Sequence, residues 1–209
     1  HHRSKACARK YDSGCDSPRE TSASALSNEG AFLWGRPYGE MVWQSNSIAV
    51  DPEGNAVMAG SFWIDDHHIN GFIAKLDAGG QQLWRREFGG GNNSGRGIAV
   101  DGDGNILVTG NRFDGEMDLG MGPLQGGLFL AKYNASGNLL WSRGFAAGDE
   151  PMASGIAVDS AGSVFIAGTF AGTADFGLEP LTTVFERDIF VAKFDAEVLA
   201  DTLRPLLER

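Results

Sequence analysis

The sequence has few basic residues and no long apolar run, and both shortages exclude classes of protein. Of its 209 residues, 17 are Lys or Arg and 27 are Asp or Glu, so the formal net charge is −10. The basic residues are scattered and form no stripe that could neutralise a phosphate backbone, so we expect no nucleic-acid partner. No apolar run approaches the roughly 20 residues that cross a bilayer, so we expect no membrane span.

Cysteine is also scarce. The only two, Cys7 and Cys15, lie in a polar, serine-rich N-terminal stretch. Such a pair fits an isolated local disulfide in an oxidising compartment, and it also fits two free thiols. The sequence leaves both alternatives open.

Recognised catalytic motifs are missing as well. There is no nucleophile elbow and no zinc-protease motif. Residues 90–96 have the glycine spacing of a phosphate-binding loop, but Arg96 and Gly97 stand where Lys and Ser or Thr should follow, and the segment leads into a strand. We therefore expect no catalytic residue and no bound cofactor, with calcium as the one alternative considered below.

Glycine, by contrast, is abundant. The chain has 30 glycines, roughly twice the average share of about 7%, which indicates many tight turns. Many of them belong to one phrase that is written three times, as IAVDPEGNAVMAG at 48–60, IAVDGDGNILVTG at 98–110 and IAVDSAGSVFIAG at 156–168. Three copies in phase imply a repeat architecture whose units bury their surfaces against one another.

Each unit reads as four short strands. In the middle copy they are expected at 97–101, 105–111, 128–133 and 138–145, with Asp-Gly and Gly-Asn turn formers after the first. The units repeat every 50 to 58 residues, as blades of a propeller do. We predict an all-β fold, a partial β-propeller of about three four-stranded antiparallel blades.

The repeat region is expected over residues 24–196. Blades are predicted at about 42–89, 94–146 and 152–196, the last without its fourth strand. A partial blade at 24–40 precedes them and supplies a fourth strand, 31–38, without the three strands before it.

The two ends depart from the repeat. Residues 1–23 have no apolar period and are expected to form a disordered tail or linker. Residues 197–209 replace the fourth strand of the third unit with a non-repeat tail of helical composition. Three alternatives follow: the chain is a piece of a longer array, two copies complete a ring, or an open arc keeps exposed edges. Self-association through unpaired blades is therefore one expected interaction.

Three residue types recur once in every unit. An Asp ends the first strand, a Lys lies in the third among apolar residues, and a Trp lies in the fourth. These structural repeat positions are Asp51, Asp101 and Asp159, then Lys75, Lys132 and Lys193, then Trp34, Trp84 and Trp141. A catalytic group is needed once, so threefold recurrence predicts a turn cap for the Asp, and for the Lys an ion pair, with the Asp as a candidate partner, or a snorkelling stem.

Two places are weighed as metal sites. Asp101, Asp103 and Asn105 alternate with glycine as in a calcium loop, but the sixth-position Gly and distal Glu of an EF-hand are missing, so a turn cap is the favoured interpretation. The second place, Asp65-Asp66-His67-His68, is where His and carboxylates cluster. Neighbours on an extended loop point in opposite directions, so a solvated loop is favoured over a metal site.

The motif G-I-A-V-D-x-x-G-N-x-x-V-x-G, followed by F-x-A-K-[LYF]-[DN]-x-x-G and a Trp, resembles the SBBP family of bacterial β-propeller repeats. The resemblance covers roughly residues 24–196 and brings no catalytic residues. It implies a propeller module on secreted or cell-surface bacterial proteins, which are mostly of unassigned function. Our hypothesis is a non-catalytic binding or scaffolding module, with a protein or a glycan as partner.

The recurring Trp also resembles that of quinoprotein propellers, whose blades use a Trp to dock onto the next blade. The enzyme alternative is thus a fragment of a quinoprotein-like oxidoreductase or of a lyase. It would need a complete ring with Arg, Asp and Glu at the axis, whereas the first strands present Ser47, Gly97 and Gly155. A spacer without any ligand is a third alternative.

Overall fold

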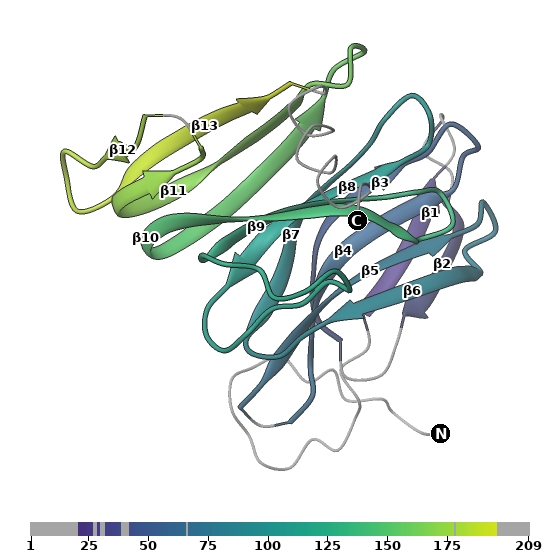
Figure 1. Ribbon diagram of the computed structural model, residues 1–209. Coiled ribbons are helices and arrows are strands. Elements are labelled where there is room, and N and C mark those ends of the chain that lie inside the picture. The colour runs from purple at the N-terminus through teal and green to yellow at the C-terminus, as the bar shows by residue number, and fades with distance from the viewer. Residues whose placement is uncertain are drawn as a thin grey trace.

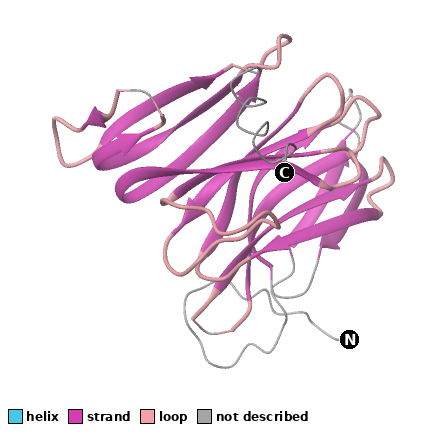
Figure 2. Cartoon of the chain, in the orientation of Figure 1, coloured by secondary structure: helices cyan, strands magenta, loops and turns pink. Residues whose placement is uncertain are grey.

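The computed structural model describes residues 21–26, 29, 32–38, 42–65, 67–177 and 179–195. All the helix or strand elements within them are strands, so the all-β prediction is confirmed (Figure 2). No helix that could cross a membrane occurs in this part of the chain. The strands are β1 (Thr21–Leu26), β2 (Phe32–Tyr38), β3 (Val42–Val50), β4 (Ala56–Trp63), β5 (Ile69–Leu76), β6 (Gln82–Phe88), β7 (Asn93–Val100), β8 (Ile106–Arg112), β9 (Leu128–Tyr133), β10 (Leu139–Val158), β11 (Val164–Asp175), β12 (Leu181–Thr182) and β13 (Asp188–Phe194).

The first complete unit, which we call blade 1, is the antiparallel sheet β3-β4-β5-β6 in chain order. Its strands have apolar residues on both pleat faces because both faces of the sheet are covered. On β4, Val57 joins a core cluster with residues of β7 to β9, whereas its neighbour Met58 joins a cluster with Trp34. The blade therefore packs against one sheet on each side.

Blades 2 and 3 share one long strand. Blade 2 contains β7, β8, β9 and the Leu139–Phe145 part of β10, which pairs with β9. The same strand continues into blade 3, where Met152–Val158 pairs with β11, and β11 in turn pairs with β13. The sequence predicted two separate strands here. They join because register shifts between Ala147 and Met152 let the chain change partner without a turn.

Blade 3 has three of its four strands in the described residues. In addition to these three, the short described strand β12 pairs with the end of β11. No described strand lies beyond β13, in the place where β6 follows β5 in blade 1. The tail predicted at 197–209 lies outside the described residues.

The N-terminal partial blade is a hairpin, β1 and β2, and not the single strand expected. In it Ala25 lies opposite Trp34, as Lys75 lies opposite Trp84 in blade 1. Strand β1 therefore occupies the third-strand position. It begins at Thr21, inside the stretch 1–23 that the sequence predicted as a tail. The prediction missed this strand because TSASAL lacks the large apolar residues by which the other third strands are recognised. Residues 1–20, with both cysteines, lie outside the described part.

The sheets lie side by side in an open arc (Figure 1). The N-terminal hairpin, in purple, lies at one end and β13, in yellow, at the other, and the arc is not closed. Three core clusters fill the junctions between successive sheets. This is the arrangement of a partial β-propeller, as the sequence predicted.

Candidate functional site

The recurring Asp builds the turn between the first two strands of each blade. The Asp51 Oδ1 atom accepts hydrogen bonds from the backbone N–H groups of Glu53 and Asn55, at 2.9 and 2.8 Å. Asp101 receives the same pair of bonds from Asp103 and Asn105, and Asp159 receives it from Ala161 and Ser163. One carboxylate oxygen thus replaces water at two turn amides, which is what the tight turn requires.

The recurring Lys meets the other Asp oxygen in two of the three blades. Lys75 Nζ lies 2.7 Å from Asp51 Oδ2, and Lys132 Nζ lies 2.8 Å from Asp101 Oδ2. In blade 3 the described partner is different, because Lys193 pairs with Asp195 at 3.0 Å.

Burial of the Lys falls steadily along the chain. The side chain of Lys75 is 4% exposed, that of Lys132 is 25% exposed and that of Lys193 is 51% exposed. The next blade explains the difference, since Lys75 Nζ also donates to the backbone carbonyl of Ala135 in blade 2. The same residue type at the same position therefore goes from core to surface as the cover of the following blade is lost.

The electrostatics follow the same order. Burial by itself raises the pKa of Asp51, but the hydrogen bonds from Lys75 and Asn55 outweigh it and lower the pKa to about 2. The pKa of Asp101 is lowered by Lys132 and Asn105, again against the effect of burial. Both carboxylates are thus held ionised by fixed partners.

The recurring Trp docks each blade onto the next. Trp34 Nε1 donates to the Ala78 carbonyl at 2.9 Å, and Trp84 Nε1 donates to the Ala135 carbonyl at 3.1 Å. Both acceptors lie in the turn between the third and fourth strands of the following blade. The turn equivalent for Trp141 includes residue 196 and lies outside the described residues.

A glycine with positive φ makes room for each docked ring. Gly137, at φ 76°, lies in the turn that accepts the Trp84 hydrogen bond, and a Cβ built on it would be 2.9 Å from the Trp84 ring. Gly80, at φ 77°, stands in the same relation to Trp34. Only glycine satisfies both the backbone and the contact there.

The first metal candidate, Asp101 with Asp103, has its main carboxylate already committed. Asp101 accepts two turn amides, the Asn105 side chain and Lys132. Asp103 is exposed at the turn surface. This geometry is that of a turn cap with an ammonium partner.

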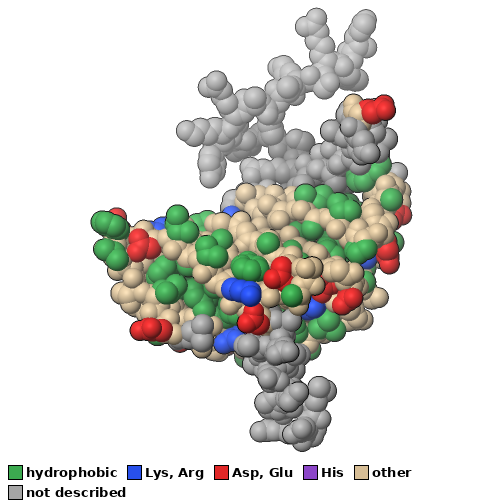
Figure 3. Space-filling view, turned by 90° about the horizontal axis from the view of Figure 1, so that it is seen from above, with side chains coloured by type: hydrophobic (Ala, Val, Ile, Leu, Met, Phe, Trp, Pro, Cys, Tyr) green, Lys and Arg blue, Asp and Glu red, His purple; other side chains and the backbone are tan. Residues whose placement is uncertain are grey.

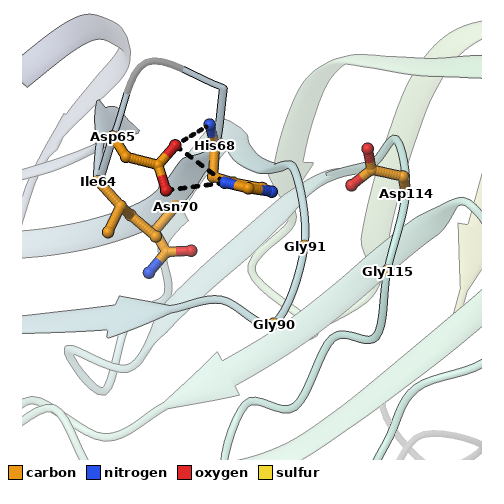
Figure 4. Close-up of a pocket in the computed structure, with 8 residues that line it drawn as sticks. All are labelled: Ile64, Asp65, His68, Asn70, Gly90, Gly91, Asp114 and Gly115. Atoms are coloured by element: carbon orange, nitrogen blue, oxygen red, sulfur yellow. Dashed lines mark hydrogen bonds and ion pairs between the residues drawn. The ribbon is translucent and has the colours of Figure 1, made fainter.

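The second candidate borders a polar hollow between the loops of blades 1 and 2 (Figure 4). His68 Nδ1 lies 2.9 Å from Asp65 Oδ2, and Asp65 also accepts the backbone N–H groups of His67 and His68. Hydrogen bonds from the His67 backbone and then from the His68 side chain lower the pKa of Asp65. His67 is exposed and does not line the hollow, and Asp66 lies outside the described residues.

The far wall of the hollow comes from Asp114, which the sequence did not single out, and its floor belongs to the segment 90–96 that was weighed as a phosphate-binding loop. Asp114 accepts hydrogen bonds from the Asn92 backbone N–H, at 2.7 Å, and from the Asn92 side chain, at 2.8 Å. The Asn92 side-chain oxygen in turn accepts a hydrogen bond from the Ile69 N–H, at 2.9 Å. Gly90 and Gly91 form the floor between the walls (Figure 4). These residues do not recur, so the repeat gave no signal for them.

The hollow measures about 450 Å³, and two carboxylates, an imidazole and an amide line it. Among the described residues no three His, Cys, Asp or Glu side chains converge as a metal site would require. The polar groups that line it are hydrogen-bond donors and acceptors.

The fold defines a class, an open array of β-propeller blades. Residues 83–111, from β6 of blade 1 to β8 of blade 2, match the family model of the SBBP β-propeller repeat. The matching family is the one that the sequence motif predicted.

No curated protein matches the chain. Among solved structures, a protein of unknown function from Bacteroides caccae is similar, at 19% identity and a TM-score of 0.48. The match covers 84% of this chain and 54% of that protein, so the chain spans about half its length.

Proposed function

We propose that the chain is a non-catalytic β-propeller repeat module with a binding and scaffolding role in a secreted or cell-surface bacterial protein. One observation carries this proposal: the recurring groups that could do chemistry are occupied by the fold. The Asp carboxylates cap turns, Lys75 and Lys132 neutralise them, and the Trp N–H groups of Trp34 and Trp84 join blades.

Binding would fall to the loops, which differ from blade to blade. The hollow between blades 1 and 2 combines the acceptors Asp65 and Asp114 with the donor and acceptor groups of His68 and Asn70. Such alternation of fixed polar groups over a glycine floor suits the hydroxyl groups of a glycan or the polar backbone and side chains of a protein loop. We favour the glycan because polar groups lie on both walls of the hollow, Asp65 and His68 on one side and Asp114 on the other (Figure 4).

The test is binding of the full chain to an array of bacterial surface glycans. We expect binding that Asp65→Asn and Asp114→Asn each weaken, while Asp103→Asn, an exposed turn residue outside the hollow, leaves it unchanged. Binding that is insensitive to both hollow variants would place the ligand elsewhere and count against this site.

The same preparation distinguishes the enzyme alternative. Pyrroloquinoline quinone added with calcium would give a shifted absorbance band if the chain formed a quinoprotein-like site. Stoichiometric uptake of this cofactor, without any glycan or protein ligand, would overturn the proposal.

A further inference from the structure

One face of blade 3 is exposed although the same face is buried in the blades before it. Ile189 and Val191 on β13 are 79% and 70% exposed. The equivalent residues of β9 are Leu128 and Leu130, which are 1% and 0% exposed in the junction between blades 2 and 3. Figure 3, whose left side looks onto the end of the molecule that contains β11 and β13, shows hydrophobic side chains at the surface there. The sequence of this face is that of a blade junction.

The opposite end of the arc has a matching gap. Ile48 and Val50 on β3 are 60% and 65% exposed, whereas Ile98, which is equivalent to Ile48, is 5% exposed in the junction between blades 1 and 2. The N-terminal hairpin covers only the outer half of blade 1, through Trp34. The inner half of this junction has no cover among the described residues.

The strands present at the two ends are complementary. Within the described residues, blade 3 has the first, second and third strands of a unit but not the fourth. The N-terminal hairpin has the third and fourth strands, and no described strand precedes it. In this part of the chain the third strand is present at both ends, as β13 and β1. β13 reads DIFVAKF and carries the repeat motif, whereas β1 reads TSASAL and does not.

We propose that a second copy of this chain covers both faces, in a closed head-to-tail dimer. Blade 3 of one copy completes the N-terminal partial blade of the other, with β13 beside the partner's β2 in place of β1. Ile189 and Val191 then bury against the partner's Ile48 and Val50. Two copies give six complete blades, within the range of four to eight in which propellers close.

The Lys position supports this assignment independently. In blades 1 and 2 the Lys of the third strand lies opposite the Trp of the fourth, so Lys193 would lie opposite the partner's Trp34. It would then approach the partner's Ala78 carbonyl, as Lys75 approaches that of Ala135. The surface pair with Asp195 would be exchanged for the buried pair with Asp159 that the repeat provides.

The test begins with the mass of the full chain in solution, by size-exclusion chromatography with light scattering over a wide range of concentration. We expect a discrete species of twice the 22.2 kDa chain mass. A monomer at every concentration overturns the proposal, and so does a series of ever larger oligomers, since a closed ring stops at two.

Two variants place the interface. Val191→Glu and Ile48→Glu lie at exposed positions, so each should fold as the wild type does, yet each should abolish the dimer because it damages both junctions. Leu83→Glu, 52% exposed on β6 and outside both faces, is the matched control and should leave the dimer intact. A dimer that survives both junction variants uses another surface and overturns the proposal.

Mixing the two variants tests the head-to-tail order. An equal mixture of Val191→Glu and Ile48→Glu chains restores one undamaged junction, so native mass spectrometry should find a dimer that contains one of each. Pairing of like faces gives no such rescue. A mixture that stays monomeric therefore overturns the assignment.

A last variant tests the strand exchange. Ala23→Pro weakens the pairing of β1 with β2, which competes with β13, so it should raise the dimer association constant severalfold. A fall in that constant would show that β1 belongs to the assembled form and would overturn the exchange.

Discussion

The three recurring lysines allow one substitution to be made in three environments. We expect Lys75→Met to destabilise the fold strongly, Lys132→Met to destabilise it less, and Lys193→Met to have no measurable effect. The position in the repeat is the same for all three, so the variants differ in the burial of the Lys and, at Lys193, in its partner.

The magnitude at Lys75 follows from what the substitution leaves behind. Asp51, whose side chain is 2% exposed, would keep its charge without its ammonium partner, and an orphaned buried charge costs about 3–5 kcal/mol. At a slope of roughly 2–3 kcal/mol per M, the urea midpoint should fall by roughly 1–2.5 M. Urea titration followed by far-UV circular dichroism measures this, with the slope compared between variants.

The pH dependence of this loss gives a second readout. In the Lys75→Met variant burial acts on Asp51 without its strongest opponent, so the pKa of Asp51 rises. Lowering the pH then neutralises the orphaned carboxyl group, and the gap between variant and wild type should narrow between neutral pH and about pH 4. If Lys193→Met cost as much as Lys75→Met, or if the gap did not change with pH, the buried pair would not be the cause.

Three further results are expected. Gly137→Ala should cost about 1–3 kcal/mol more than Gly54→Ala, because both have positive φ but only the first would press a Cβ onto the Trp84 ring; thermal unfolding of the two variants measures the difference. Trp84→Phe should cost about 1–2 kcal/mol in urea unfolding, because the hydrogen bond to the Ala135 carbonyl is lost, and an unchanged midpoint would contradict the docking role. Acid unfolding should begin below about pH 4, because the pKa of Asp51 is about 2 in the folded chain and about 3.9 in the unfolded one. The ionised Asp51 therefore contributes its full stability above the higher pKa, and this contribution is lost as the pH falls through the lower one. Circular dichroism against pH measures the loss.

The repeat made the blades predictable from the sequence. The phrase I-A-V-D-x-x-G-N placed the first two strands because both the alternation and the turn residues are local. The ion pair of Asp51 with Lys75 was one predicted alternative, because residues that recur at the same position in every blade indicate a structural role common to the blades.

The sequence could not show which blade has a neighbour. Val191 and Leu130 occupy equivalent positions in the repeat, yet Val191 is exposed and Leu130 is buried, because burial depends on whether a following sheet covers the strand. Strand β1 escaped notice since TSASAL has no large apolar residue before Leu26, and only the register with β2 in the structure identifies it. The hollow at Asp65 and Asp114 was missed for a third reason: it joins loops from two blades, and its residues do not recur.

The burial and the partner of each recurring Lys therefore indicate whether a following blade covers its strand. A third-strand Lys that is buried and bonded to the next blade marks a closed junction, as Lys75 does with the Ala135 carbonyl. One that turns to a nearby surface carboxylate marks an open junction, as Lys193 does with Asp195. Strand β13 around Lys193 keeps the repeat motif of a junction strand, including the apolar residues Ile189 and Val191. A chain that keeps Ile189 and Val191 beside such a Lys keeps the apolar residues of a junction at a face that no described blade covers, which is why we propose that a second copy covers it.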